Sequence, residues 1–119
     1  MKENNIVKEK SYKFAVRIVK LYKYLCDEKK EFVLSKQLLR SGTSIGANIE
    51  EAIGGQSDKD FFAKLTISYK EARETHYWLR LLKDTDYLTE QEFQSIIIDC
   101  EELLKIIGSI QKTIKSRNS

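Results

Sequence analysis

Proline is absent from the 119-residue chain, and cysteine, histidine and tryptophan are scarce. Without proline, no helix interior suffers the missing N–H group and the ring clash that proline introduces. The two cysteines, Cys26 and Cys100, are too few for a disulfide framework and have no metal-binding neighbours in the sequence. We therefore expect both to be small buried side chains of a protein in a reducing compartment.

Long apolar runs are also missing. No stretch approaches the roughly 20 apolar residues that are needed to span a bilayer. The N-terminal sequence MKENNIVKEK lacks the apolar core of a signal peptide. These two absences predict a cytoplasmic protein with no membrane partner.

The scarcity of histidine argues against the chemistry that helical bundles often carry. Di-iron bundles need a Glu-x-x-His motif on each of two helices, whereas this chain has one histidine, His76, with Arg73 three residues before it. Nucleophilic catalysis needs a base that is oriented by a third group, but Glu74 and Thr75 are consecutive with His76 and point in different directions on a helix. We expect no metal, no cofactor, no catalytic residue and no enzymatic activity.

What the chain does contain is apolar residues at helical spacing in four segments, residues 5–29, 34–54, 58–84 and 89–115. No segment alternates as a strand does, and the three connections are short. Short connections favour antiparallel neighbours, so the sequence predicts an all-α, up-and-down four-helix bundle formed by one domain of residues 1–119. The predicted inner face of the first helix is Ala15, Ile18, Val19, Tyr22, Leu25 and Cys26.

Local signals mark several helix ends. Gly54 and Gly55 are typical of a helix C-terminus. Ser57 or Asp58 is suited to open the third helix. Thr89 with Glu92 three residues later forms a capping box at the start of the fourth helix.

The stretch RSGTSIGANIEEAIGG, residues 40–55, resembles a glycine-rich phosphate loop at first sight. A Walker loop needs Lys-Ser or Lys-Thr after its last glycine and an apolar strand before it, and both are missing here. Apolar and small residues instead step by four and three, the rhythm of helices packed in a bundle. The stretch is therefore predicted to be helical, with Gly42 and Gly46 allowing a neighbouring helix to come close.

Charge is uneven along the chain. Residues 1–40 carry 11 Lys/Arg against 5 Asp/Glu, and residues 41–111 carry 7 against 13. One predicted face of the first helix is basic, and the last eight residues add three cations without an acid. This pattern predicts nucleic-acid contact that is independent of sequence and sensitive to salt. The candidate residues are Lys10, Lys13, Arg17, Lys20, Lys112, Lys115 and Arg117.

The third helix carries a second row of side chains outside its core row. Apolar residues in line on an exposed face are unusual for a monomer. Either the fourth helix covers this row, or the row is a subunit interface with Trp78 as its aromatic anchor, and we favour the interface. Its residues are Ile67, Glu71, Glu74, Trp78 and Leu81.

Two motifs carry a resemblance to a known family. The pattern S-I-x-x-N-I-x-E falls on residues 44–51, and K-E-A-x-E-T falls on residues 70–75. Together they resemble the bacterial four helix bundle protein family, also called the ribosomal-RNA intervening-sequence protein family. Many relatives have glycine after the glutamate of the first motif, where this chain has Ala52.

The resemblance implies ring-forming bundles, often pentamers, and no enzymatic activity. A related branch, the accessory protein of diversity-generating retroelements, binds nucleic acid and a reverse transcriptase. Two functions follow as hypotheses: a homo-oligomer that binds RNA or DNA through a basic face, or a scaffold for another protein without nucleic-acid binding. A reverse transcriptase is a possible protein partner in either case.

Overall fold

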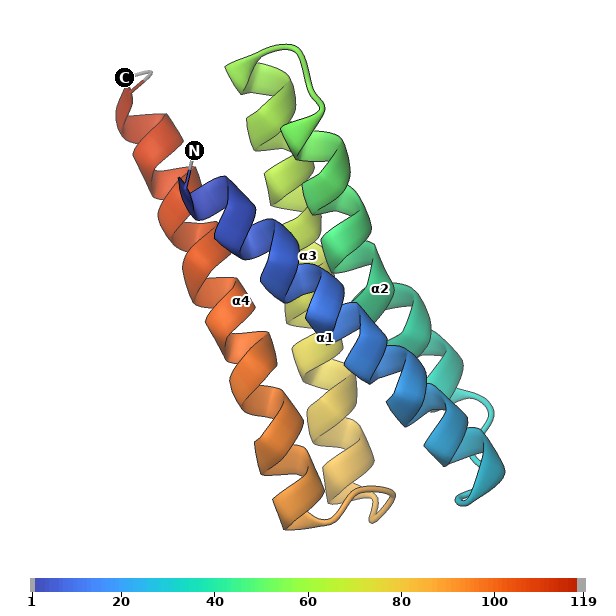
Figure 1. Cartoon of the computed structure of the whole chain (residues 1–119). Helices are drawn as coiled ribbons and strands as arrows, with labels where there is room; N and C mark the ends of the chain where they lie inside the picture. Colours follow the sequence, from blue (N-terminus) through green and yellow to red (C-terminus); the bar gives the residue numbers. More distant parts are fainter. Residues whose placement is uncertain (1, 118–119) are drawn as a thin grey trace.

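The computed structural model describes residues 2–117 and consists of four helices. They are α1 (Lys2–Asp27), α2 (Leu34–Ile53), α3 (Asp58–Asp84) and α4 (Glu90–Arg117). Successive helices run in opposite directions (Figure 1). The predicted all-α, up-and-down bundle is confirmed, and each helix begins and ends within three residues of the predicted bounds. Residues 40–53 are helical, so the glycine-containing stretch is not a phosphate loop.

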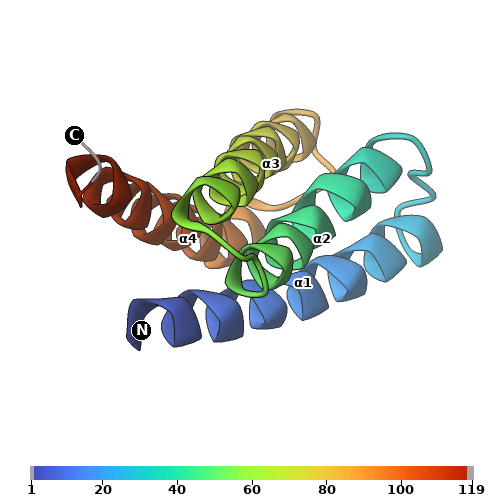
Figure 2. The same ribbon diagram turned by 90° about the horizontal axis from the view of Figure 1, so that it is seen from above.

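The bundle is elongated, with principal extents of 47 × 21 × 20 Å. Helices α1 and α4 approach each other near the N-terminus of α1 and diverge toward its C-terminus (Figures 1 and 2). The pairs α1–α2, α2–α3 and α3–α4 remain side by side. The bundle is therefore more open between its first and last helices than elsewhere.

Every helix turns one row of side chains into a shared core, as amphipathic helices do. The core rows of α2, α3 and α4 follow helical spacing, and Phe61 and Leu104 are half-buried at the edge of the core. Small polar residues at the α2–α3 contact form hydrogen bonds within the protein. Ser68 Oγ donates to the carbonyl oxygen of Ile45 at 2.9 Å, and Thr75 Oγ1 donates to Ser41 Oγ at 2.9 Å.

The predicted inner face of α1 is partly wrong. Ile18 and Leu25 are buried as expected, but the other four predicted residues are only half-buried. The helix is rotated so that its core row is Val7, Ser11, Phe14, Ile18 and Leu25. Apolar residues cover a wide arc of α1, so its period alone did not decide which part of the arc faces inward.

Glycine brings α2 into close contact with α1. A Cβ atom on Gly42 would lie 2.8 Å from both Cγ1 and Cγ2 of Ile18, and one on Gly46 would lie 3.2 Å from the carbonyl oxygen of Ser11. The side chain of Ile18 therefore occupies the space that any other residue at position 42 would need. The predicted role of these glycines is confirmed.

The N-terminal caps of α3 and α4 are those that the sequence predicts. Ser57 Oγ accepts from the N–H of Asp60 at 3.1 Å. The capping box is complete, because Thr89 N–H donates to Glu92 Oε1 at 2.8 Å and Glu92 N–H donates to Thr89 Oγ1 at 3.1 Å. Gly54 caps the end of α2 with φ of −79°, so this C-cap does not use the left-handed conformation available to glycine.

Helix α2 begins without a side-chain cap on Val33, its N-cap residue. Glu31 supplies the cap instead: its carboxylate accepts from the N–H groups of Val33, Leu34 and Ser35 at 3.2, 2.8 and 2.8 Å. Burial tends to raise the pKa of Glu31, but hydrogen bonds from Leu34, Ser35 and Val33 outweigh it, so this pKa lies below its ordinary value. The ionised carboxylate thus stabilises the fold.

Replacing Gly42 with alanine is expected to lower the free energy of unfolding by about 1–3 kcal/mol, because the new methyl group overpacks against buried Ile18. Alanine is otherwise the better helix former, so Gly108→Ala is the matched control. There a Cβ would meet only Tyr69 Cε2, at 3.6 Å. We expect Gly108→Ala to stabilise the protein by up to about 1 kcal/mol in urea unfolding. Equal stabilisation by both variants would contradict the close α1–α2 contact.

Glu31→Gln is expected to reduce stability at neutral pH by about 1 kcal/mol, the usual effect of losing a helix cap. Because the folded-state pKa is depressed, the contribution of Glu31 is present above its ordinary value of 4.5 and is lost as pH falls through the lower folded value. The difference between parent and variant should therefore shrink below about pH 4.5. Glu28→Gln in the same loop is the control. A difference that stays constant down to acid pH would mean that the charge of Glu31 is unimportant.

Candidate functional site

Two residues of the predicted basic face connect α1 to α4. Lys10 Nζ lies 3.1 Å from Glu102 Oε1. Arg17 Nη1 lies 2.6 Å from Asp99 Oδ2, and the same guanidinium donates to the carbonyl oxygen and the Oγ atom of Ser95 at 3.0 and 2.8 Å. The rotation of α1 brings these side chains beside α4, where acidic residues neutralise them. Lys10 and Arg17 are therefore structural contacts in the folded protein.

The other five predicted nucleic-acid residues differ in their surroundings. Lys13 pairs only with Glu9, one turn earlier on α1, at 3.0 Å. Arg117 pairs with Asp58 at 3.2 Å, and Lys115 Nζ lies 5.9 Å from the ring centre of Phe62. Lys20 and Lys112 form no ion pair within residues 2–117. Lys112, Lys115 and Arg117 lie in the last two turns of α4, apart from the candidate residues of α1.

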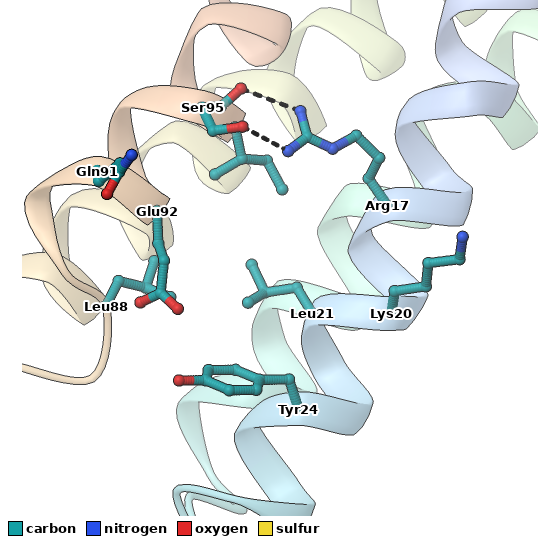
Figure 3. A pocket seen from close by; sticks show the side chains of 9 residues that line it. Arg17, Lys20, Leu21, Tyr24, Leu88, Gln91, Glu92 and Ser95 are labelled. Atoms are coloured by element: carbon teal, nitrogen blue, oxygen red, sulfur yellow. Dashed lines mark hydrogen bonds between the residues drawn. The ribbon is translucent and has the colours of Figure 1, made fainter.

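A groove of about 620 Å³ lies where α1 and α4 diverge (Figure 3). Leu21 and Tyr24 point from α1 toward Leu88, which lies just before α4, and Lys20 lines the α1 edge of the groove. Arg17 closes one end through its hydrogen bonds to Ser95. The groove is a shallow apolar depression with polar edges, and sequence periodicity gave no sign of it because it depends on the angle between two helices.

The second row on α3 lies along the outer side of the α2–α3 pair. Ile67 is 42% exposed, whereas Trp78 and Leu81 are half-buried and Trp78 packs against the core. Trp78 Nε1 donates to Glu74 Oε2 at 3.4 Å, and Arg40 of α2 pairs with the same oxygen at 2.8 Å. The predicted row therefore has an apolar part and a charged part that also holds α2 to α3.

Glu71 shows how closely packed this row is. Arg40 Nη1 lies 3.9 Å from Glu71 Oε2, within ion-pair distance, but this buried oxygen accepts no hydrogen bond in the part of the chain that the structure describes. A buried carboxylate oxygen without a donor is costly unless a nearby charge compensates it. The positive charge of Arg40 thus compensates the carboxylates of both Glu71 and Glu74.

Tyr77 is a surface residue of this region that the row pattern missed. Its side chain is 49% exposed, and its ring meets the Trp78 ring edge-on with centres 5.1 Å apart. The guanidinium of Arg80 lies 5.8 Å from the Tyr77 ring centre. Tyr77 immediately precedes Trp78 and points to a different side of the helix, so helical periodicity does not place it in the row. The pair of consecutive aromatic residues was the available sequence signal.

The residues with potential for catalysis lie apart from the groove. His76 Nε2 lies 3.1 Å from Glu101 Oε2 of α4, not beside Glu74 or Thr75. Burial, followed by the charges of Glu101 and Asp99, raises the pKa of the Cys100 thiol to about 12. At neutral pH this thiol is protonated, so it is a poor nucleophile and a poor metal ligand.

Three further observations concern the described residues only. Within residues 2–117, no three or more histidine, cysteine or acidic side chains are grouped so that they could hold a metal ion. None of the four described helices is long and apolar enough to cross a membrane. Cys26 and Cys100 are both free thiols.

Comparisons with known proteins agree with the fold. The chain is similar to a protein of unknown function from the S23 ribosomal protein family of Bacteroides thetaiotaomicron, whose crystal structure is 58% identical in sequence, with a TM-score of 0.91. The match covers 92% of this chain and 98% of that one. No curated protein matches. Residues 3–109 match the family described as 23S rRNA-intervening sequence protein, and the chain therefore belongs to that family.

Proposed function

We propose that this protein functions as a non-enzymatic homo-oligomer whose subunits associate through the outer face of α2 and α3. The observation that carries the proposal is that Ile67, Tyr77 and Trp78, three large apolar side chains of α3, are exposed or half-buried, with Tyr77 and Trp78 in contact. Such a group on a bundle with an otherwise complete core is typical of a protein interface. The resemblance described above favours a ring, with a pentamer as the expected state.

The composition of this face supports an interface. Aromatic residues and arginine are enriched at binding hot spots, and Trp78, Tyr77 and Arg40 supply both kinds. The Arg40–Glu74 contact at 2.8 Å keeps the polar edge in one arrangement before association. Pre-ordered side chains lose less conformational entropy on binding.

The reactive groups support a binding role rather than a catalytic one. Cys100 is buried with a protonated thiol, and its Sγ atom already donates to the carbonyl oxygen of Ala72 at 3.4 Å. His76 is engaged with Glu101 on the surface between α3 and α4. We place the protein in the cytoplasm, where free thiols such as these persist.

A second candidate function is nucleic-acid binding. Lys13 and Lys20 support it, because neither is neutralised by another helix, unlike Lys10 and Arg17. Lysines that are not used within the fold can release counterions when they meet phosphates. The C-terminal cations Lys112, Lys115 and Arg117 form a separate candidate site. A scaffold for another protein is the alternative, and the salt titration below separates the two.

Ile67→Glu is expected to release folded monomers, because it places a charge on the proposed interface without reaching the core. Ile98→Glu is the matched control, since Ile98 is 59% exposed on α4 and lies outside the interface. Light scattering should show the parent and the Ile98 variant as oligomers and the Ile67 variant as a monomer with unchanged circular dichroism. A monomeric parent would end the proposal. Trp78→Glu is less informative, because Trp78 also packs on the core.

Replacing Lys13 and Lys20 together with glutamine is expected to weaken binding to duplex DNA of any sequence. The slope of log affinity against log salt should become shallower by about 0.9 per lysine removed. Lys105→Gln, an exposed lysine on α4, is the control. If the parent shows no binding even at low salt, the scaffold function is the better one.

A further inference from the structure

The loop between α1 and α2 displays two large apolar side chains to solvent. Phe32 is 54% exposed, and Val33, at 71%, is the most exposed large apolar side chain among residues 2–117. The two residues are consecutive in this loop, which lies at one end of the bundle (Figure 1). Because the two exposed apolar side chains are adjacent, they form a small continuous apolar surface that is suited to binding.

The exposure is imposed by a rigid main chain. Glu31 is only 7% exposed, and its carboxylate holds three N–H groups of the loop and the start of α2. Glu31 N–H donates to the carbonyl oxygen of Leu25 at 3.0 Å, and Ser35 Oγ donates to the carbonyl oxygen of Glu31 at 2.8 Å. Lys30 is held at φ of 53°, a conformation unfavourable for a residue with a side chain. Phe32 and Val33 therefore project from a fixed platform.

Lysines are frequent in the sequence on both sides of this platform. Five of them, Lys20, Lys23, Lys29, Lys30 and Lys36, lie on the last turns of α1, the loop and the first turn of α2. None forms an ion pair within the described residues. Lys29 Nζ lies 6.0 Å from the ring centre of Tyr24.

The acids nearby do not cancel this charge. Asp27 and Glu28 are the two exposed acids of the same segment, and the carboxylate of Glu31 is already used by the loop. Asp84, the last residue of α3, lies 3.8 Å from Lys83, and the α3–α4 loop that follows it lies at the same end of the bundle as the α1–α2 loop (Figure 1). The surface therefore combines unpaired cations with an exposed aromatic ring.

We propose that this loop, residues 28–33, with its flanking lysines binds single-stranded nucleic acid. Phe32 stacks on an unpaired base, Val33 packs against the sugar or base beside it, and the lysines contact phosphates. The proposal rests on the second candidate function and names its site. Base–aromatic stacking with a basic track is the usual mode of binding to single strands. Duplexes are bound less well, because their bases are already stacked on each other.

The placement of the lysines favours a strand over a lipid surface. Lys20 precedes the end of α1 by seven residues, which is about 10 Å of helix at 1.5 Å per residue. A flat bilayer touched by the loop would not reach this far up the side of the helix, whereas a flexible strand follows it. Two apolar side chains are also a small anchor for a membrane.

The test measures binding of a short fluorescent single-stranded oligoadenylate by anisotropy at two salt concentrations. Phe32→Ala should lower affinity about tenfold with little change in the salt slope, because stacking involves no counterions. Lys30→Gln and Lys36→Gln should each make the slope shallower by about 0.7. Tyr12→Ala, which removes another aromatic side chain that is 66% exposed, and Lys105→Gln should bind as the parent does.

Several outcomes would overturn the inference. If the parent binds oligoadenylate and Phe32→Ala binds equally well, the site lies elsewhere while nucleic-acid binding stands. If the parent binds neither oligoadenylate nor duplex DNA, the nucleic-acid function and this site both fail, while the oligomer is unaffected. Binding of phosphatidylglycerol vesicles but not oligoadenylate would assign the loop to a membrane. Conversion of the parent oligomer to monomers by Phe32→Ala, seen by light scattering, would assign Phe32 to a subunit contact.

Discussion

The close contact between α1 and α2 at Gly42 and Gly46 is the constraint on which the rest of the bundle depends. Ile18 fills the space above Gly42, and the main chain of Ser11 lies against Gly46. This contact fixes the rotation of α1, because the row that contains Ser11 and Ile18 must face α2. Phe14 then enters the core, and the opposite edge of α1 turns toward α4. Gly42 and Gly46, which have no side chains, thus decide how the neighbouring helix α1 is oriented.

The rotation of α1 divides its cations into two groups. Lys10 and Arg17 lie beside Glu102 and Asp99 and join the first helix to the last. These contacts are partly exposed, so each contributes modestly to stability. Their main effect is that Lys10 and Arg17 are neutralised within the subunit and are not available to bind a partner. Lys20 and Lys23, nearer the end of α1, form no such ion pair within residues 2–117. Positive charge available for binding therefore concentrates at the α1–α2 loop.

The two proposed binding surfaces differ in their chemistry and their position. The α2–α3 face combines Ile67, Tyr77 and Trp78 with an internally balanced Arg40–Glu74 contact, which suits a protein surface of the same kind. The loop around Phe32 carries an unbalanced positive charge, which suits a polyanion. In a ring assembled through the first surface, each subunit would present one such loop, and weak contacts would add through avidity.

The sequence by itself determined the helices and most of the core, because periodicity, capping residues and short loops are local properties. Thr89 with Glu92, and the small-residue spacing of Gly42 and Gly46, were readable for this reason. Only the tertiary structure decided the rotation of α1, the neutralisation of Lys10 and Arg17, and the exposure of Phe32. Apolar residues lie on a wide arc of α1, so its period fits several rotations, and the choice depends on contacts with residues far along the chain. Likewise, the exposure of Phe32 and Val33 depends on the carboxylate of Glu31, which holds the loop that turns them outward.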